Sequence, residues 1–309
     1  MLETIKYILI DALCMGLPYA LLALGIFISY RMLDFADLTC EGSFTLGGAV
    51  CVSGIILGIN PWIASILGGI SGFLSGIITG LLHTKLKIPA LLSGIITMTA
   101  LFSINLLVMG ITKDSPSFAQ AFNTVAYIGD NKTIFSLKIF NNKNINVIFI
   151  SSIIVFCFVS FIYWFFGTEF GMSIRATGMN QQMARSQGIN TTIMIIFGLG
   201  FGNFLISVSG ALTAQYTMSA KSDMGTGALV IGLASIILGE SIFGKRSFKN
   251  WIISVTLGAI VYYLIIGIAI NLGLPTFLLK LLYAILIVII LIIPFIKKIF
   301  NNKKGALSC

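Results

Sequence analysis

Long apolar runs separated by short polar segments dominate this chain. Most runs approach the roughly 20 residues that a helix needs to cross about 30 Å of hydrocarbon. They cover about residues 6–29, 42–58, 62–82, 89–111, 147–167, 192–217, 225–239, 251–271 and 276–296. The pattern predicts an all-α, polytopic membrane helix bundle of about eight to ten transmembrane or broken helices, forming one transmembrane domain over residues 1–309.

Two of these runs are short and rich in glycine, serine and threonine. They read GSFTLGGAVCVSGIILG at 42–58 and GTGALVIGLASIILG at 225–239. Paired short or interrupted spans are typical of a transport pathway, because broken backbone is tolerated at membrane depth only where protein or a cavity surrounds it. Tight helix packing explains the same composition, and the sequence leaves both interpretations open.

A third run carries glycine at every fourth position. Gly68, Gly72, Gly76 and Gly80 share one face of the predicted helix 62–82. Small residues at this spacing let a second helix approach closely. The spacing therefore predicts a packing groove, not a binding site.

Composition places the chain in a membrane and charge sets its orientation. Hydrophobic residues make up 57% of the chain and charged residues 9%, whereas soluble domains carry about 25% charge. The net charge of +9 comes from cations at the ends of apolar runs, which is a topology signal and not a nucleic-acid surface. We expect the segment 168–190 to be cytoplasmic and the loop 112–146 to be extracellular.

Catalytic and metal-binding patterns are not found. The five cysteines show no CxxC spacing, and His83 is the single histidine. The chain has no GxxxxGK[ST] phosphate loop and no paired carboxylates inside a run. We therefore expect no enzyme activity, no metal and no cofactor on this chain. No charge lies clearly at the centre of a run, which argues against an ion-coupled carrier.

The polar segment 168–190, TEFGMSIRATGMNQQMARSQGIN, predicts two short helices. The first runs from about Met172 to Thr177 and is stopped by Gly178. Asn180 caps the second, which runs through Gln181–Gln187, and Gly188 ends it in the left-handed conformation. Compact capped helices between two spans favour a docking site for another protein. A surface loop with incidental helical turns is the alternative.

The pattern Gly171-x-x-x-Arg175-Ala176-x-Gly178-x-Asn180-x-x-x-Ala184-x-x-x-Gly188-Ile189-Asn190 resembles the coupling motif of a known family. That family comprises the permeases of ATP-binding-cassette (ABC) importers of the branched-chain amino acid and ribose type. The segments 19–25, 37–47 and 209–212 resemble the family as well. The segments 34–47 and 87–110 are most similar to a bacterial subgroup associated with tryptophan or tyrosine uptake.

The resemblance implies a bacterial plasma-membrane importer subunit that works with partners. The expected partners are separate ABC ATPase subunits that bind ATP and Mg²⁺, an extracytoplasmic solute-binding (lipo)protein, a second permease copy and membrane lipid. The expected solute is an amino acid, aromatic or branched-chain. A sugar or nucleoside importer and a stand-alone secondary transporter remain alternatives.

Candidate site residues fall into two groups. For coupling to the ATPase we name Gly171, Arg175, Ala176, Gly178, Asn180, Ala184, Arg185, Gly188, Ile189 and Asn190. For the translocation pathway we name Thr39, Glu41, Ser43, Thr45, Thr97, Thr99, Ser103, Asn105, Asn203 and Ser207. The pathway residues can instead bond between helices or to their own helix, and Glu41 can cap a helix. Arg185 can instead bind lipid phosphate.

Overall fold

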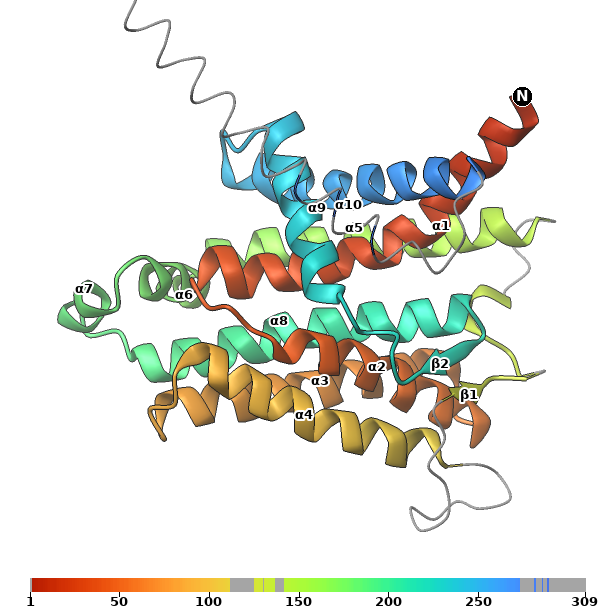
Figure 1. Ribbon diagram of the computed structural model, residues 1–309. Coiled ribbons are helices and arrows are strands. Elements are labelled where there is room, and N and C mark those ends of the chain that lie inside the picture. Colours follow the sequence, from red (N-terminus) through yellow and green to blue (C-terminus); the bar gives the residue numbers. More distant parts are fainter. Residues whose placement is uncertain are drawn as a thin grey trace, which may run out of the picture.

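The computed structural model is a bundle of long helices (Figure 1). It describes residues 2–111, 125–129, 131–136 and 142–272, with single residues at 281, 285 and 288. Its helices are α1 (Leu2–Ile26), the π-helix η1 (Phe27–Met32), α2 (Thr39–Ile56), α3 (Pro61–Thr84), α4 (Ala90–Met109), the short 3-10 helix η2 (Ile134–Ser136), α5 (Lys143–Gly167), α6 (Glu169–Met179), α7 (Gln181–Ser186), α8 (Thr191–Tyr216), α9 (Ala228–Phe243) and α10 (Phe248–Asn271). Its strands are β1 (Val125–Tyr127) and β2 (Ser219–Lys221).

The predicted membrane helices are confirmed across the described residues. Seven of them are long and apolar enough to span a bilayer, and α9 is a shorter apolar helix of 16 residues. These eight match eight of the nine predicted runs. Most of the ninth run, 276–296, lies outside the described residues.

Both short glycine-rich runs begin inside the bundle, as broken spans do. After η1 the chain turns back and runs without helical structure through residues 33–38 before α2 starts (Figure 1). The chain likewise re-enters after α8, and α9 starts within the bundle (Figure 1). The two helix starts meet, because Thr45 on α2 accepts a hydrogen bond from the backbone N–H of Gly225, just before α9, at 3.1 Å. The structure therefore supports the broken-span interpretation.

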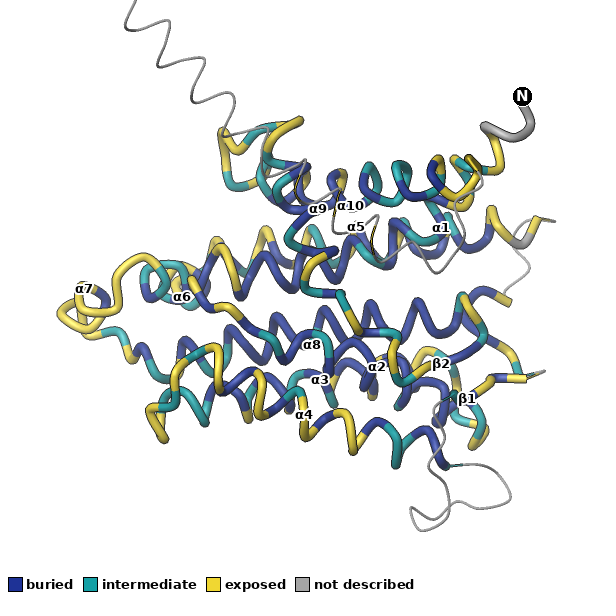
Figure 2. Tube along the Cα trace, in the orientation of Figure 1, coloured by how far each residue is buried: buried dark blue, intermediate teal, exposed yellow. Residues whose placement is uncertain are grey.

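The predicted glycine groove on α3 is confirmed as a packing surface. A Cβ atom added to Gly72 or Gly76 would overlap the backbone of α8, and one added to Gly68 would overlap that of α2. Figure 2 shows that α8 and α2 form the buried centre of the bundle, whereas α4 carries many exposed positions. The absence of side chains on this face of α3 lets its backbone lie directly on these central helices.

The two ends of the bundle differ in charge and structure. The helices α6 and α7 lie at the same end as the α3–α4 and α9–α10 turns (Figure 1), which carry Lys85, Lys87, Lys245 and Arg246. This clustering of cations is the pattern expected of a cytoplasmic end. At the other end β1 pairs antiparallel with β2, which ties the predicted extracellular loop to the re-entrant segment before α9. Strands of three residues were not predicted, because they are too short to show a period.

Candidate coupling surface and translocation pathway

The first helix of the predicted coupling segment is longer than expected. Helix α6 runs Glu169–Met179, and the side chain of Thr168 caps it by accepting a hydrogen bond from the N–H of Gly171. The prediction that Gly178 stops the helix is wrong. Gly178 lies within the last turn, where a Cβ atom would overlap the carbonyl oxygen of Met32 at the end of η1. Its role is close approach, not termination.

The second helix and both of its ends match the prediction closely. The side chain of Asn180 accepts hydrogen bonds from the backbone N–H groups of Gln182 and Met183, each at 3.0 Å. Gly188 adopts φ +80°, the left-handed conformation that ends a helix. Asn190 then caps α8 through the N–H of Ile193. The segment is thus an ordered pair of capped helices at the cation-rich end of the bundle.

The ten predicted coupling residues divide by exposure. Asn180, Arg185, Gly188 and Asn190 are exposed, whereas Gly171 and Ala184 are buried and Arg175, Ala176, Gly178 and Ile189 are half-buried. Both arginines have partners within the chain. The Arg175 guanidinium lies 4.6 Å from the ring centroid of Phe248, and the Nε of Arg185 donates to the hydroxyl of Thr191 at 2.9 Å.

Sequence reasoning missed the most exposed apolar side chains of this surface. Met179 is 88% exposed, Met183 is 64% exposed and Met172 is 51% exposed, all on α6 or α7. Methionine is flexible and polarisable and is favoured at surfaces that bind other proteins. The three methionines of this mostly polar segment were the sequence signal that could have indicated such a surface. They give α6 and α7 exposed apolar side chains that a partner protein could contact.

Most predicted pathway residues are buried and already bonded between helices. The hydroxyls of Thr39 and Thr79 lie 2.7 Å apart, and those of Ser43 and Ser75 lie 2.6 Å apart, joining α2 to α3. Ser207 on α8 donates to the carbonyl of Ser43 at 2.8 Å. Thr45 and Thr97 are also buried and donate to carbonyls of their own helices. These hydroxyls hold the centre of the bundle together.

The two intramembrane asparagines bond across helices in the same way. Asn105 donates to the carbonyl of Gly42 at 3.2 Å, and Asn203 donates to the carboxylate of Asp37 at 2.6 Å. Asp37 is only 2% exposed and also accepts from the backbone N–H of Thr39. The sequence missed this buried acid, because it lies in the break between two apolar runs and not inside one.

Three pathway candidates remain partly or fully exposed. Glu41 is half-buried in the first turn of α2, and one of its carboxylate oxygens accepts from the N–H of Gly227 at 3.0 Å. Glu41 therefore caps the start of α9, not of its own helix as the sequence suggested. Thr99 and Ser103 are exposed on α4, one turn apart on the same face.

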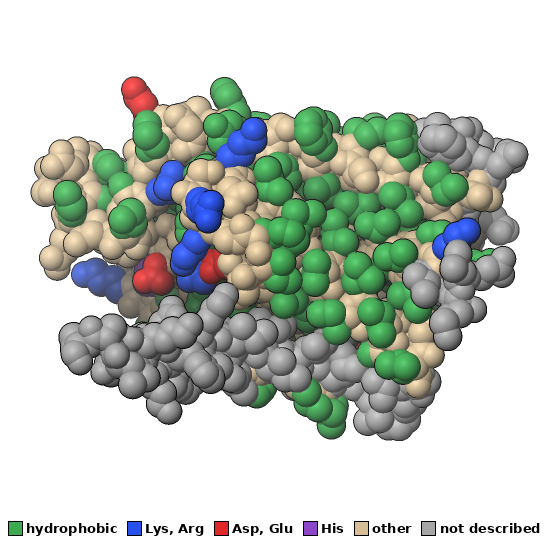
Figure 3. Space-filling view, turned by 90° about the horizontal axis from the view of Figure 1, so that it is seen from above, with side chains coloured by type: hydrophobic (Ala, Val, Ile, Leu, Met, Phe, Trp, Pro, Cys, Tyr) green, Lys and Arg blue, Asp and Glu red, His purple; other side chains and the backbone are tan. Residues whose placement is uncertain are grey.

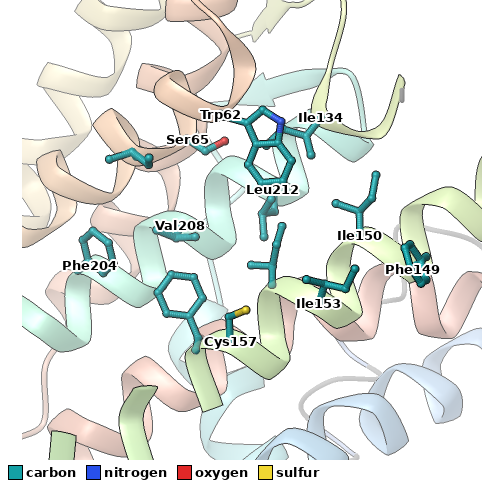
Figure 4. Close-up of a pocket in the computed structure, with 13 residues that line it drawn as sticks. Trp62, Ser65, Ile134, Phe149, Ile150, Ile153, Cys157, Phe204, Val208 and Leu212 are labelled. Carbon is teal, nitrogen blue, oxygen red and sulfur yellow. The ribbon is translucent and has the colours of Figure 1, made fainter. Parts of the chain in front are cut away.

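The hollow between α3, α5 and α8 does not suit a polar solute. Its volume is about 450 Å³, and Figure 4 shows apolar side chains such as Trp62, Phe149 and Phe204 around it. The hydroxyl of Ser65 at its edge already donates to the carbonyl of Pro61 and accepts from Gln215. An amino acid or sugar would find few hydrogen-bonding groups in this mostly apolar lining.

Comparison with known proteins gives the family. Residues 8–293 match the family described as "branched-chain amino acid transport system / permease component". The chain belongs to this family. It is 35% identical over 280 residues to a tyrosine transport system permease protein of Clostridioides difficile, which covers 91% of this chain and 89% of the relative.

More distant relatives are similar over smaller fractions or at lower identity. An uncharacterised protein of Rickettsia prowazekii is 29% identical over 91% of this chain and 96% of its own length. The ribose import permease protein of Bacillus subtilis is 28% identical over 68% of this chain and 62% of its own length. The chain is therefore the permease component of an ABC-type system for amino acids or sugars. It is a transporter subunit, not a catalytic enzyme, and a multi-pass protein of the bacterial plasma membrane.

Proposed function

We propose that this permease forms the translocation pathway of an importer for an amino acid with an aromatic or branched side chain. A separate ATPase drives the importer, and an extracytoplasmic binding protein delivers the solute. The proposal is supported most by the capped helices α6 and α7, which present exposed methionines at the cytoplasmic end. A stand-alone carrier has no need of such a rigid apolar surface.

The contacts of α6 suggest how a docked ATPase would act on the membrane helices. Gly178 brings α6 directly against Met32 and Leu33, where the chain leaves η1 and re-enters the bundle. The re-entrant segment continues to Asp37, which binds Asn203 on α8, and then to the start of α2. Movement of α6 would therefore reach the broken helix α2 through rigid backbone contacts.

The exposure of the candidate side chains shortens the list of residues that would contact solute. The seven buried candidates donate hydrogen bonds inside the bundle, although the side-chain oxygens of Asn105 and Asn203 accept none there. Glu41, Thr99 and Ser103 are the candidates that are partly or fully exposed and so remain open to solute. Glu41 would bind the ammonium group of an amino acid with its second carboxylate oxygen, which accepts no hydrogen bond from the described residues. Thr99 and Ser103 would face the pathway between α4 and the second permease copy.

The docking surface can be tested by co-purification from the native membrane. The variant M179E/M183E places two carboxylates on the methionine surface without removing any hydrogen bond of a side chain. We expect the amount of ATPase that co-purifies with this variant to be at least about tenfold lower than with the wild-type permease. The control is Leu86→Glu, because Leu86 is a similarly exposed cytoplasmic residue, at 65%, outside α6 and α7.

Either of two outcomes would contradict the docking proposal. One is equal recovery of the ATPase with M179E/M183E and wild type. The other is transport by the purified permease in liposomes without ATP, which would favour a stand-alone carrier. The solute is tested separately, by uptake of labelled tyrosine, leucine and ribose into cells that express the complete system. Uptake of ribose alone would replace the amino acid assignment with a sugar.

A further inference from the structure

A groove in the membrane-spanning surface ends beside a group of cations. Its volume is about 510 Å³, within the roughly 300–1,000 Å³ of small-ligand sites. Most of its wall is apolar and comes from α1, α5 and α10, with Leu17, Val155, Phe156, Val159, Ile252 and Ile253. Lys249, in the first turn of α10, and Tyr163, in the last turns of α5, line its cytoplasmic end.

The cations at this end have no acidic partners among the described residues. Lys245, Arg246 and Lys249 are all exposed, and none forms an ion pair there. The nearby acid Glu240 is already bound by Arg31 at 2.7 Å and by the indole of Trp251. Figure 3 shows most of the visible Lys and Arg side chains near one end of this face, with a few acidic side chains among them, and many hydrophobic side chains along the middle of the face.

A second hollow lies beside the start of α10. It measures about 580 Å³ and is lined by Arg246, Ser247 and Asn250, among others. The start of α10 therefore carries a polar hollow with one cation and an apolar groove with another. Both lie at the cytoplasmic end of the bundle, where headgroups of the inner leaflet are found.

This arrangement fits a ligand with an anionic head and a long apolar tail. Basic pockets between transmembrane helices on the cytoplasmic side bind anionic lipid headgroups. A small soluble anion would leave the groove unused, and a neutral chain would leave the cations unpaired. We propose that the start of α10 binds an anionic phospholipid, with one acyl chain in the α5–α10 groove and its phosphate at Lys249 and Arg246.

The bound lipid would lie next to the coupling segment. Phe248, adjacent to Lys249, packs against Phe166 at the end of α5 and under the guanidinium of Arg175 on α6. A lipid that orders the first turn of α10 would also steady this contact. The site thus links the inner leaflet to the helix that we propose receives the ATPase.

Native mass spectrometry of the purified permease tests the proposal. The probes are dioleoyl phosphatidylglycerol and dioleoyl phosphatidylcholine, which share acyl chains and differ in charge. A juxtamembrane cation contributes about fivefold to anionic lipid binding, equivalent to about 1 kcal/mol. We expect R246Q/K249Q to retain phosphatidylglycerol about 25-fold less than wild type, while its weak retention of phosphatidylcholine is unchanged.

Two further variants distinguish lipid binding at this site from attraction of lipid to any surface cation. K85Q/K87Q removes two exposed cytoplasmic cations from the α3–α4 turn, away from the groove, and should retain phosphatidylglycerol as wild type does. Val159→Trp fills the groove and should lower the retention of both lipids, while the protein stays monodisperse.

Three results would overturn the proposal. Undiminished retention of phosphatidylglycerol by R246Q/K249Q would show that these cations do not bind the headgroup. An equal loss in K85Q/K87Q would show that binding follows only total charge. Full lipid retention by R246Q/K249Q, with loss of the co-purifying ATPase, would assign the cations to the protein partner instead.

Discussion

The carboxylate of Glu41 accepts a hydrogen bond from the backbone N–H of Gly227, at 3.0 Å and across 186 residues of sequence. Glu41 lies in the first turn of α2, and Gly227 immediately precedes α9. The starts of the two broken helices therefore share one carboxylate. Because helix starts carry partial positive charge, a carboxylate between them is favoured by both.

We expect Glu41→Ala to destabilise the protein by about 1–3 kcal/mol, because the N–H of Gly227 loses its partner inside the bundle. Glu41→Gln keeps an acceptor and should cost less. The measurement is thermal unfolding in detergent. The control is Glu169→Ala, which removes an acid from the first turn of α6. Equal stability of Glu41→Ala and the control would show that the bond contributes nothing.

The long elements of this fold could be predicted from the sequence, and the bonds between them could not. The apolar runs have the length of a span, so eight helices were found to within a few residues. The cap at Asn180 and the left-handed Gly188 were found because both depend on local backbone conformation. Gly178 was misread because the contact that requires glycine there comes from Met32, 146 positions earlier in the chain.

The polar interior shows the same limit. Sequence patterns identified Asn203 as a buried amide, but its partner Asp37 lies 166 residues away in a short break between spans. Seven of the ten pathway candidates proved to be buried, because their residue types suit both hydrogen bonding between helices and contact with solute. Only the three-dimensional packing distinguishes these two uses. The predicted assignment of these residues to a pathway remains a proposal.

The packing of α6 against η1 gives a prediction about energy coupling. Gly178→Ala adds a methyl group where the carbonyl of Met32 leaves no room, so α6 must move away from the re-entrant segment. We expect the ATPase to co-purify nearly as well as with wild type, while solute uptake falls by at least about tenfold. Ser173→Ala, also on α6, removes a hydroxyl that bonds to its own helix and should leave uptake unchanged. Normal uptake by Gly178→Ala would contradict the proposed route.

The glycine groove on α3 predicts that replacing glycine by alanine changes the stability of the protein in a direction that depends on position. Alanine stabilises an ordinary helix by up to about 1 kcal/mol relative to glycine. At Gly76, however, a Cβ atom would overlap the backbone of Leu199 on α8, and overpacking costs about 1–3 kcal/mol. At Gly167 no atom lies within 4 Å of the added Cβ. The thermal unfolding temperature of Gly76→Ala should therefore lie below that of wild type, and that of Gly167→Ala should equal or exceed it.

The bond between Asp37 and Asn203 can be measured as a coupling energy. A hydrogen bond contributes about 0.5–1.5 kcal/mol between neutral groups and about 1.5–3 kcal/mol when one group is charged, so a double-mutant cycle of D37A and N203A should give a coupling of about 0.5–3 kcal/mol. The control cycle pairs D37A with N105A, because Asn105 donates to the carbonyl of Gly42 and shares no hydrogen-bond partner with Asp37 among the described residues. Its coupling should lie within about 0.5 kcal/mol of zero.

Uptake by the same two variants distinguishes a purely structural bond from a bond that breaks during transport. If the bond persists in every state of transport, D37A and N203A should reduce uptake only as far as they reduce the amount of folded permease in the membrane. If the re-entrant segment moves as α6 moves, the bond must break in one state. Uptake per folded molecule should then change in both variants while ATPase recovery does not. We expect the second result, because residues 33–38 connect the contact at Gly178 directly to Asp37. Uptake that tracks folded protein alone would make this bond a purely structural one.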